Sequence, residues 1–300
     1  MNKKFWKGKR ILITGFEGFL GSNLTKALLS SGAKSFGLDI RLCRKDTILT
    51  LSDYKKIGVI NGSVTNYKLL ERVINDNKIN LVFHLAAEAI VGACYDNPLR
   101  NFSTNTEGTW KLLEACRNAG NIDAIIIASS DKAYGAHKEL PYKEEAPLIG
   151  RHPYDVSKSC ADLIACAYAH TYGLPVAITR CGNIYGPGDY NFSRIVPDTI
   201  RCALSGKTLL IRSDGKFIRD YVFVEDIVNG YIVLTEKLQK LKLAGEAYNL
   251  SAENPIKVID LVNKIFKIAV KKPNYRILNE ARYEIKNQYL SSEKVRKTID

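Results

Sequence analysis

Three glycines at three-residue spacing, Gly15, Gly18 and Gly21, join a short apolar run to a segment with helical periodicity. The run, 10–14, is typical of a buried strand, and the segment 22–31 carries apolar residues at three- and four-residue spacing. A GxxGxxG turn in this context lets the backbone approach a pyrophosphate and directs a helix N-terminus at its negative charge. The strand and helix context disfavours a glycine turn without a ligand. The turn residues that we expect at a dinucleotide cofactor are Gly15, Gly18, Phe19, Leu20 and Gly21.

A regular alternation of strand-like and helix-like segments follows this turn. Short apolar runs bounded by polar residues or glycine predict further buried strands over 35–40, 57–60, 80–84, 123–129 and 175–180. Apolar residues at helical spacing predict helices over 67–76, 105–119 and 154–172, several of which end at a glycine. This alternation predicts an α/β doubly wound fold, in which helices cover both faces of a parallel sheet.

The pattern changes after residue 181, where loops become more frequent. A turn at 213–215 and helices over 225–238 and 257–269 predict a smaller mixed domain on the substrate side. We therefore expect a dinucleotide-binding domain over residues 1–181 and a substrate-binding domain over residues 182–300. The helix over 225–238 can pack back against the first domain.

Composition narrows the class of protein. The 300 residues are 46% hydrophobic and 25% charged, which is typical of a folded globular chain and excludes a disordered one. No apolar run approaches the roughly 18 to 20 residues of a membrane span, and no signal-peptide pattern follows the basic N-terminus. We therefore expect a cytoplasmic protein without membrane contact. The seven cysteines form no CxxC pair and the four histidines lack HxxxH or HExxH spacing, so we expect reduced cysteines and no metal site.

The formal net charge of +13 raises nucleic acid as a partner. The basic residues are scattered, however, and no nucleic-acid-binding motif accompanies them. A positive field also suits a small polyanion such as a diphosphate. We therefore expect a small-molecule partner and no nucleic acid.

Asp39 ends the second predicted strand. A carboxylate at this position can accept both ribose hydroxyls of an adenosine and would repel a 2′-phosphate. Arg41 and Arg44 follow closely, and these residues could instead hold that phosphate. The sequence thus favours NAD over NADP and leaves NADP as the alternative.

Tyr154 and Lys158 stand four residues apart, which places both on one face of the predicted helix. A nearby ammonium lowers the pKa of a phenol, so Tyr154 is a candidate proton acceptor near neutral pH. Such pairs also occur as plain neighbours on a helix surface. The dinucleotide turn earlier in the chain is what favours the catalytic interpretation.

Ser130, Asp131 and Lys132 directly follow the fifth predicted strand. Ligands of doubly wound sheets bind beyond the carboxyl ends of the strands, where these side chains would emerge. The alternative is an ordinary polar exit from a strand. A potential acid and a potential base near Tyr154 favour a role in chemistry.

Several motifs together resemble the extended short-chain dehydrogenase/reductase superfamily of nucleotide-sugar enzymes. They are the glycine turn 15–21, His84-Leu85-Ala86-Ala87, Asn105-Thr106-Glu107-Gly108-Thr109, Tyr154-Asp155-Val156-Ser157-Lys158, Arg-Cys-Gly-Asn-Ile-Tyr-Gly-Pro at 180–187, Phe-Ile-Arg-Asp-Tyr at 217–221, and Tyr248-Asn249. The resemblance covers nearly the whole chain, and the combination is highly specific. Within the superfamily the chain is most similar to CDP-glucose 4,6-dehydratases and related dehydratases, which carry Asp-Lys after the fifth strand. Sugar 4-epimerases usually have small or uncharged residues at these two positions.

The resemblance implies a Rossmann fold and a hydro-lyase with an internal NAD redox cycle, which converts an NDP-hexose to an NDP-4-keto-6-deoxyhexose. Tyr154 would take the proton of the C4 hydroxyl while NAD⁺ accepts the C4 hydride, and Lys158 would lower the pKa of Tyr154 and hold the nicotinamide ribose. Lys132 would remove the C5 proton while Asp131 protonates the departing C6 hydroxyl, and NADH would return hydride to C6. The hydroxyl of Ser130 would bond the C4 oxygen.

The resemblance also implies a set of binding residues. Beyond the glycine turn, Asp39, Tyr154 and Lys158, cofactor contacts are expected at Ile40, Ser63, Val64, Leu85, Ala86, Ala87 and Asn105. Substrate contacts are expected at Asn183, Arg194, Arg212, Arg219 and Asn249, where the arginines suit a diphosphate.

Two features depart from the pattern of the superfamily. Ser63 stands where relatives usually place an Asp that receives the adenine amino group. The sequence also ends at Asp300, before the Gly-Trp-containing segment of relatives, so either the substrate domain is shorter or the sequence is truncated.

Two alternatives stay open at this point: a nucleotide-sugar 4-epimerase and a non-catalytic nucleotide-binding relative. The sequence does not name the nucleobase or the sugar. The resemblance further implies a homodimer that uses the helices over 105–119 and 154–172.

Overall fold

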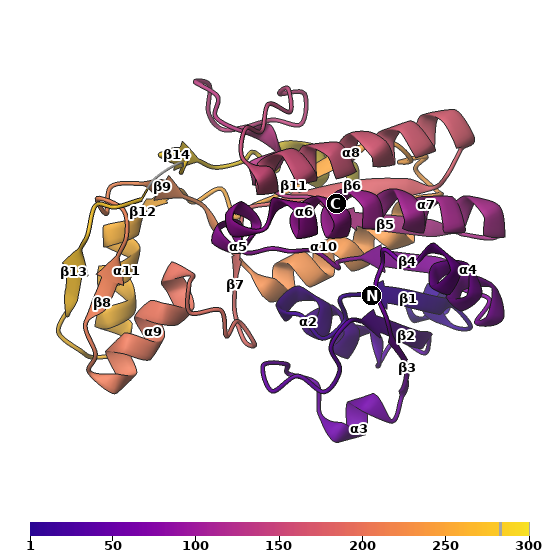
Figure 1. Ribbon diagram of the computed structural model, residues 1–300, viewed down its shortest axis with the longest axis horizontal. Coiled ribbons are helices and arrows are strands. Elements are labelled where there is room, and N and C mark those ends of the chain that lie inside the picture. Colours follow the sequence, from indigo (N-terminus) through magenta and orange to yellow (C-terminus); the bar gives the residue numbers. More distant parts are fainter. Residues whose placement is uncertain (282–283, 300) are drawn as a thin grey trace.

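A seven-stranded parallel sheet forms the centre of the molecule (Figure 1). The structure is a computed structural model, and it describes residues 1–281 and 284–299. The strand order is β11-β6-β5-β4-β1-β2-β3, and each neighbouring pair is parallel. The strands are β1 (Arg10–Thr14), β2 (Lys34–Asp39), β3 (Ile57–Asn61), β4 (Leu81–His84), β5 (Ala124–Ala128), β6 (Val176–Cys181) and β11 (Ala247–Leu250). The order reverses beside β1, so the expected doubly wound fold is confirmed.

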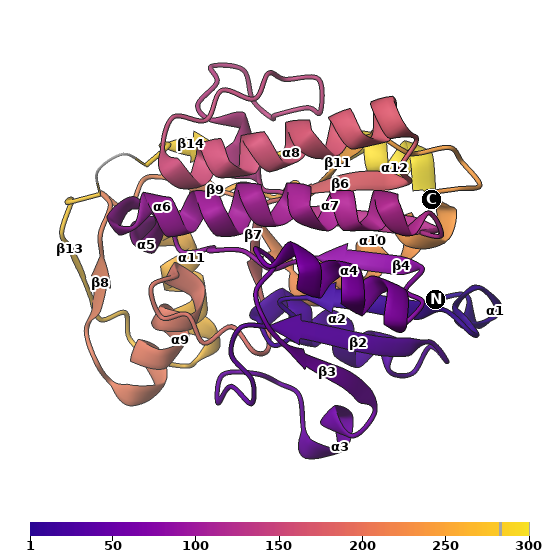
Figure 2. The ribbon, with the colours of Figure 1, turned by 45° about the vertical axis from the view of Figure 1, so that its right-hand side comes forward.

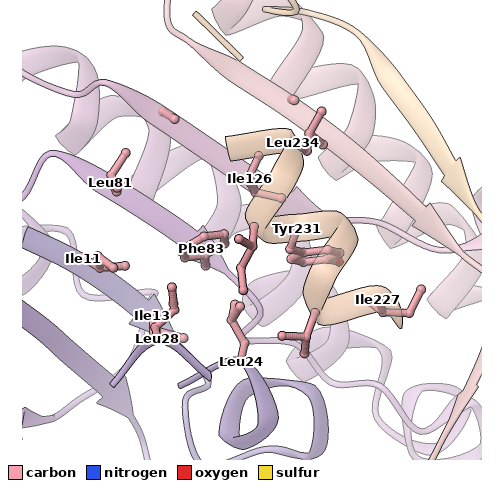
Figure 3. Packing of buried hydrophobic residues seen from close by; sticks show 14 of the residues in the cluster. Ile11, Ile13, Leu24, Leu28, Leu81, Phe83, Ile126, Ile227, Tyr231 and Leu234 are labelled. Atoms are coloured by element: carbon pink, nitrogen blue, oxygen red, sulfur yellow. The ribbon is translucent and has the colours of Figure 1, made fainter. Parts of the chain in front are cut away.

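Helices bury both faces of this sheet. On β1, the side chains of Ile11 and Ile13 face one core and that of Leu12 faces the other, because successive strand residues point to opposite faces. The first core lies under α2 (Phe19–Leu28) and α10 (Val224–Lys237), and Figure 3 shows their side chains against β1, β4 and β5. The second core lies under α4 (Tyr67–Asp76), α7 (Gly108–Ala119) and α8 (Pro153–Tyr172), which lie side by side in Figure 2.

Two helix boundaries differ from the predicted ones, because the local backbone conformation, and not the apolar periodicity, determines where these helices begin. The helix α2 begins at Phe19 rather than Ser22, because Gly18 is its N-cap and the glycine turn is its first turn. The predicted helix 105–119 divides into the π-helical turn η1 (Ser103–Glu107) and α7. Gly120 and Gly173 end α7 and α8 in the left-handed conformation, as the sequence predicts for C-terminal glycines.

A smaller lobe stands beyond the carboxyl ends of the sheet strands, at the left of Figure 1. Its helices are α9 (Ile195–Ser205) and α11 (Val258–Ile268), which pack on each other. Short strands flank them: β8 (Leu209–Ile211) with β13 (Tyr275–Ile277), and β9 (Ile218–Arg219) between β12 (Ile256–Lys257) and β14 (Asn287–Gln288). Buried Leu209, Ile211, Val262 and Phe266 form the separate core of this lobe.

The chain after residue 181 also returns to the large sheet. The helix α10 contacts α2, β5 and β6, and β11 adds the seventh strand beside β6. The helix α12 (Glu293–Ile299) contacts both β11 and α10. A division at residue 181 therefore marks only where the chain first enters the smaller lobe, because α10 and β11, both within 182–300, complete the large sheet and its helix layer.

Short elements connect the main ones. They are α1 (Lys3–Trp6), α3 (Leu51–Tyr54), α5 (Val91–Asp96), α6 (Pro98–Phe102), the 3₁₀ turn η2 (Asp131–Tyr134), and the parallel pair β7 (Asn183–Tyr185) and β10 (Tyr221–Phe223). Within residues 1–281 and 284–299, the chain contains no helix long and apolar enough to cross a membrane.

Candidate active site

A cleft of about 1000 Å³ lies between the carboxyl ends of the sheet strands and the smaller lobe. Both parts of the chain line it, since the glycine turn and the ends of β2, β4 and β5 face segments of the lobe. Nearly every residue predicted for the site borders this cleft. They are Gly15, Gly18, Phe19, Leu20, Gly21, Asp39, Ile40, Ser63, Val64, Leu85, Ala86, Ala87, Ser130, Asp131, Lys132, Tyr154, Lys158, Asn183, Arg194, Arg212 and Arg219.

The glycine turn brings backbone to the floor of the cleft. Gly15 has a φ of +70°, and a Cβ at this position would lie 2.9 Å from the backbone of Ala86. A Cβ on Gly21 would lie 2.0 Å from the carbonyl oxygen of Gly15. A side chain is therefore excluded at Gly15 and at Gly21, and the first N–H groups of α2 border the cleft, where they can bind an anion. This cradle fits the pyrophosphate of a dinucleotide.

Asp39 lies at the edge of the same cleft and is only 8% exposed. Burial raises the pKa of its carboxyl, while a hydrogen bond from the backbone N–H of Arg41 opposes that shift. The guanidinium of Arg44 donates two hydrogen bonds to Asp46, of 2.9 and 2.5 Å. With Arg44 paired in this way and the carboxylate of Asp39 facing the cleft, the geometry suits a ribose with free hydroxyls.

The end of β4 is tied to the end of β1. The backbone N–H groups of Leu85 and Ala86 both donate to Oγ1 of Thr14 at 3.2 Å, and the same hydroxyl lies 2.8 Å from Nδ1 of His84. Burial lowers the pKa of His84 to about 3, so this imidazole is neutral near pH 7. These bonds hold the backbone of 85–87 against the cleft.

Asn105 does not line the cleft, which corrects its prediction as a cofactor contact. Its side chain is 2% exposed and holds the chain behind the cleft wall. Its amide oxygen accepts from the backbone N–H of Glu88 at 2.8 Å, and its amide nitrogen donates to Ser157 and Asn101. Asn105 therefore fixes the wall that carries Glu88 against the start of α8.

Tyr154 and Lys158 point from the first turns of α8 into the cleft. Burial raises the pKa of the Tyr154 phenol, and a hydrogen bond with Ser130 and the charge of Arg194 act against that shift. The ammonium of Lys158 donates to the carbonyl oxygen of Ala128 at 2.7 Å, and burial lowers the pKa of Lys158 to about 8. The lowering of the tyrosine pKa by Lys158 stays a prediction.

Asp131 and Lys132 open the 3₁₀ turn η2, which two residues separate from the end of β5. The hydroxyl of Ser130 caps this turn by accepting from the backbone N–H of Lys132 at 3.2 Å, and it donates to the carboxylate of Asp131 at 3.0 Å. Burial lowers the pKa of the Lys132 ammonium. An acid and an amine thus face the same cleft as Tyr154, and a lowered lysine pKa favours a neutral, basic amine.

The substrate-side arginines stand on the lobe. Arg194 is the N-cap residue of α9, and its guanidinium lies 3.4 Å from Asp189. Arg219 is 6% exposed and donates to the carbonyl oxygens of Ile218 and Lys286, both at 2.9 Å. Arg212 is exposed at the cleft border. All three cations line the cleft, with the guanidinium of Arg194 over the ring of Phe19, and they suit a second diphosphate.

Asn249 does not line the cleft either, which corrects its prediction as a substrate contact. It is fully buried and lies outside the lining of the cleft. Its amide oxygen accepts from the hydroxyl of Tyr134 at 2.8 Å, and its amide nitrogen donates to the carbonyl of Tyr142 at 3.0 Å. Asn249 therefore supports the turn that carries Asp131 and Lys132 from behind.

Sequence reasoning missed three residues at the site. Glu88 directly follows the predicted Ala87, lines the cleft and forms a 2.6 Å ion pair with Arg100. Asp155 stands between Tyr154 and Lys158 in the recognised motif, is 5% exposed and lines the cleft. Gln288 is fully buried and contacts Lys132 from a distant part of the chain. Only Glu88 and Asp155 had a signal, their place beside or inside quoted motifs, whereas Gln288 had none.

Comparison with known proteins identifies relatives of this chain. Residues 11–251 match the model of the NAD dependent epimerase/dehydratase family. The chain is 34% identical over 251 residues to CDP-glucose 4,6-dehydratase of Salmonella typhimurium, and the match covers 79% of this chain and 69% of that protein. It is 30% identical over 309 residues to a trifunctional UDP-glucose 4,6-dehydratase of Arabidopsis thaliana, with 97% of this chain and 45% of that longer protein covered.

Solved structures share the whole architecture. The dTDP-glucose 4,6-dehydratase of Bacillus anthracis, determined in complex with NAD, superposes with a TM-score of 0.85 at 29% identity, covering 97% of this chain and 90% of that one. An epimerase of Methanothermobacter thermautotrophicus superposes with a TM-score of 0.90 at 27% identity, covering 99% of this chain and 88% of that one. Fold similarity thus extends to dehydratases and epimerases alike, and the residues of the cleft must distinguish them.

Proposed function

This chain belongs to the NAD dependent epimerase/dehydratase family, and from that premise we propose that it is a nucleotide-sugar 4,6-dehydratase. The reaction converts an NDP-hexose to an NDP-4-keto-6-deoxyhexose with loss of water. Among the sugar nucleotides, CDP-glucose is the first candidate substrate, because the Salmonella typhimurium relative is named for it.

One observation carries the proposal: Asp131 and Lys132 border the same cleft as Tyr154 and Lys158. A redox step at one sugar carbon requires only a proton acceptor beside the nicotinamide, which the second pair supplies. Elimination of water from the neighbouring carbons additionally requires a base and an acid, which the first pair supplies. An epimerase has no use for this additional acid and base.

The cofactor site fits NAD by the glycine cradle and by Asp39. The residues that would hold it are those of the turn 15–21, Asp39 at the adenosine ribose, and the backbone of 85–87. When bound, NAD supplies a reversible hydride acceptor for the sugar.

The first step belongs to Tyr154. Its phenolate oxygen takes the proton of the C4 hydroxyl as this carbon is oxidised to a ketone. Ser130 already forms a hydrogen bond with the phenol of Tyr154, and its hydroxyl also bonds the C4 oxygen of the sugar. Lys158 stabilises the phenolate by its positive charge and orients the ribose beside it.

The second step belongs to Lys132 and Asp131. The C4 ketone acidifies the C5 proton, which passes to Nζ of neutral Lys132, and the electron pair of the broken C–H bond forms the C5–C6 double bond. The C6–O bond breaks as the carboxyl of Asp131 donates a proton, and water leaves. Reduction at C6 and return of a proton to C5 complete the 4-keto-6-deoxy product. Burial of Lys132 lowers the pKa of its ammonium, which favours a neutral amine.

A substrate panel tests this function. Purified protein with NAD is incubated with CDP-glucose, dTDP-glucose, UDP-glucose, UDP-GlcNAc and GDP-sugars, and the products are read by mass spectrometry and NMR. One of them should lose the mass of one water and show a C6 methyl group. A product of unchanged mass inverted at C4 would overturn the dehydratase in favour of an epimerase. Bound NAD without turnover would favour a non-catalytic relative.

The epimerase remains the second candidate, because the epimerase of Methanothermobacter thermautotrophicus has a TM-score of 0.90 to this chain. Both activities use the Tyr154 and Lys158 pair, so fold similarity does not separate them. The charged pair Asp131 and Lys132 favours the dehydratase.

We also propose that the protein forms a homodimer through α7 and α8. These helices lie side by side on one face, and large apolar side chains remain exposed on and beside them. Leu163 is 58% exposed, Leu99 is 79% exposed, and Trp110 and Tyr172 are exposed as well. Large apolar side chains exposed on neighbouring helices are typical of a protein interface.

A further inference from the structure

Gln288 reaches the candidate base from the far end of the chain. It lies on β14, 156 residues after Lys132, and its side chain is fully buried. Buried glutamines are uncommon, because both halves of the amide must be hydrogen-bonded to offset the loss of water. The partners of this amide therefore indicate what it does.

Both halves of the amide are bound to the turn η2. The oxygen Oε1 of Gln288 accepts a hydrogen bond from the ammonium of Lys132. The nitrogen Nε2 donates to the backbone carbonyl of Asp131 at 2.8 Å. A lysine ammonium only donates and a carbonyl only accepts, so the orientation of the amide follows from its two partners. Gln288 thus holds the lysine and the preceding backbone at the same time.

The segment that carries Gln288 is itself fixed on both sides. Towards the lobe, β14 pairs with β9, with Gln288 in register with Arg219. Towards the sheet, the N–H of Tyr142 donates to the carbonyl of Tyr289 at 3.0 Å, and the N–H of Ser291 donates to the carbonyl of Tyr142 at 2.9 Å. Buried Leu290 packs against Tyr134 and Tyr142. The amide is therefore presented to Lys132 from a rigid support.

Charged groups face Lys132 from several elements. Asp131 belongs to the same turn, Asp155 lies on α8, Arg219 on β9, and Glu284 just before β14. The carboxylates favour the ammonium form and the guanidinium disfavours it. Gln288 is a neutral acceptor among these charges. It holds the side chain of Lys132 in place without adding a charge that would keep the amine protonated.

We propose that Gln288 is the positioning residue that directs Lys132 toward the C5 proton. Through Gln288, the smaller lobe supports the base of the elimination step. This assignment rests on the proposed function, in which Lys132 is the base. Gln288 itself touches no reacting atom in this scheme.

The test compares Gln288→Glu and Gln288→Leu with the wild type, with CDP-glucose or the panel member turned over in its place. The readouts are kcat, KM, the pH profile of kcat, and exchange of the C5 proton with solvent deuterium. The Leu variant should lower kcat and C5 exchange together, by about tenfold or more at an unchanged KM, because base catalysis depends on alignment.

The pH profiles of kcat should shift in opposite directions in the two variants, which a purely structural role would not produce. A carboxylate at position 288 raises the pKa of Lys132, so the acid limb of kcat should move to higher pH. Leucine removes an acceptor that favours the ammonium, so the limb should move to lower pH. Gln239→Leu changes the only other glutamine of the chain, an exposed one, and should leave all readouts unchanged.

Wild-type C5 exchange and an unmoved acid limb in the Glu and Leu variants would overturn the role of Gln288. If the Leu variant fails to fold, the Glu variant, which is nearly equal in shape, decides by its pH profile alone. Unchanged C5 exchange in Lys132→Met would instead overturn the proposed base, and with it the assignment of Gln288.

Discussion

The hydroxyl of Thr14 and the imidazole of His84 lie 2.8 Å apart, at the carboxyl ends of the neighbouring strands β1 and β4. On its other side, Nε2 of His84 lies 3.1 Å from the hydroxyl of Thr109 on α7. The imidazole therefore joins two strands and a helix directly beneath the cofactor cradle. Because Thr14 also accepts hydrogen bonds from the N–H groups of Leu85 and Ala86, these contacts fix the position of the backbone that lines the cleft after β4.

The stability of the fold should depend on pH through His84. Its pKa is about 3 in the folded protein, compared with 6.5 for an unperturbed histidine, so protonation favours the unfolded chain. The stabilising effect is fully present above pH 6.5 and is lost progressively as the pH falls toward 3. Chemical denaturation at a series of pH values from neutral to mildly acidic measures the free energy of unfolding. His84→Gln should flatten the dependence, whereas exposed His170→Gln should not. Equal slopes for wild type and His84→Gln would contradict this account.

Lys132→Met should separate oxidation from elimination. The methionine keeps the approximate length of the side chain but cannot accept the C5 proton, so product formation should fall by about 10²-fold or more. Rapid mixing with substrate should still reduce the bound nicotinamide, read by its absorbance. Lys138→Met, at an exposed position nearby, serves as the control. Water loss at the parental rate in the Lys132 variant would exclude this lysine as the base.

Tyr154→Phe should remove the first step. Without the phenol oxygen no group takes the C4 proton, and turnover should fall by about 10²- to 10⁴-fold, as for other general bases. The same variant should show no reduction of nicotinamide on mixing, in contrast to Lys132→Met. Tyr172→Phe alters an exposed tyrosine at the other end of the same helix and should retain activity. Full nicotinamide reduction in Tyr154→Phe would assign the proton to another group.

Asp39→Ala should weaken NAD and relax discrimination against NADP. Loss of hydrogen bonds to a carboxylate should raise the Kd of NAD by about 10- to 100-fold, since charge-assisted bonds contribute about 1.5 to 3 kcal/mol. Removing the negative charge should also remove the repulsion between Asp39 and a 2′-phosphate, with Arg41 close by to favour that phosphate. Calorimetric titration with both cofactors measures the ratio, with exposed Asp76→Ala as the control. An unchanged ratio of the two Kd values would place the adenosine ribose elsewhere.

Leu163→Glu should dissociate the proposed dimer. A carboxylate placed in an apolar interface loses hydration without gaining a partner, so the dimer Kd should rise by about tenfold or more. Light scattering over a range of concentrations measures the oligomeric state. Leu51→Glu changes an even more exposed leucine, on α3, away from α7 and α8, and should leave the dimer intact. A wild type that is monomeric at all concentrations would reject the interface.

The amino-acid sequence alone determined the doubly wound sheet, because that inference needs only local information. The run 124–128 is apolar throughout, as a strand covered on both faces requires, and the helices between the strands show a period near 3.6. The run 57–60 was also predicted to be buried, but it forms the half-exposed edge strand β3. The glycine turn, Asp39 and the Tyr154 and Lys158 pair were visible for the same reason, since each depends on short spacing along one or two elements.

Tertiary structure alone decided the roles of Asn105, Asn249 and Gln288. The two asparagines lie within recognised motifs, yet their side chains face the protein interior and support the cleft wall from behind. Gln288 has no motif, and its contact with Lys132 exists because β14 pairs with β9, 69 residues earlier in the chain at Arg219. Whether a polar side chain turns toward a ligand or toward a neighbouring backbone depends on long-range packing, and local spacing carries no record of it.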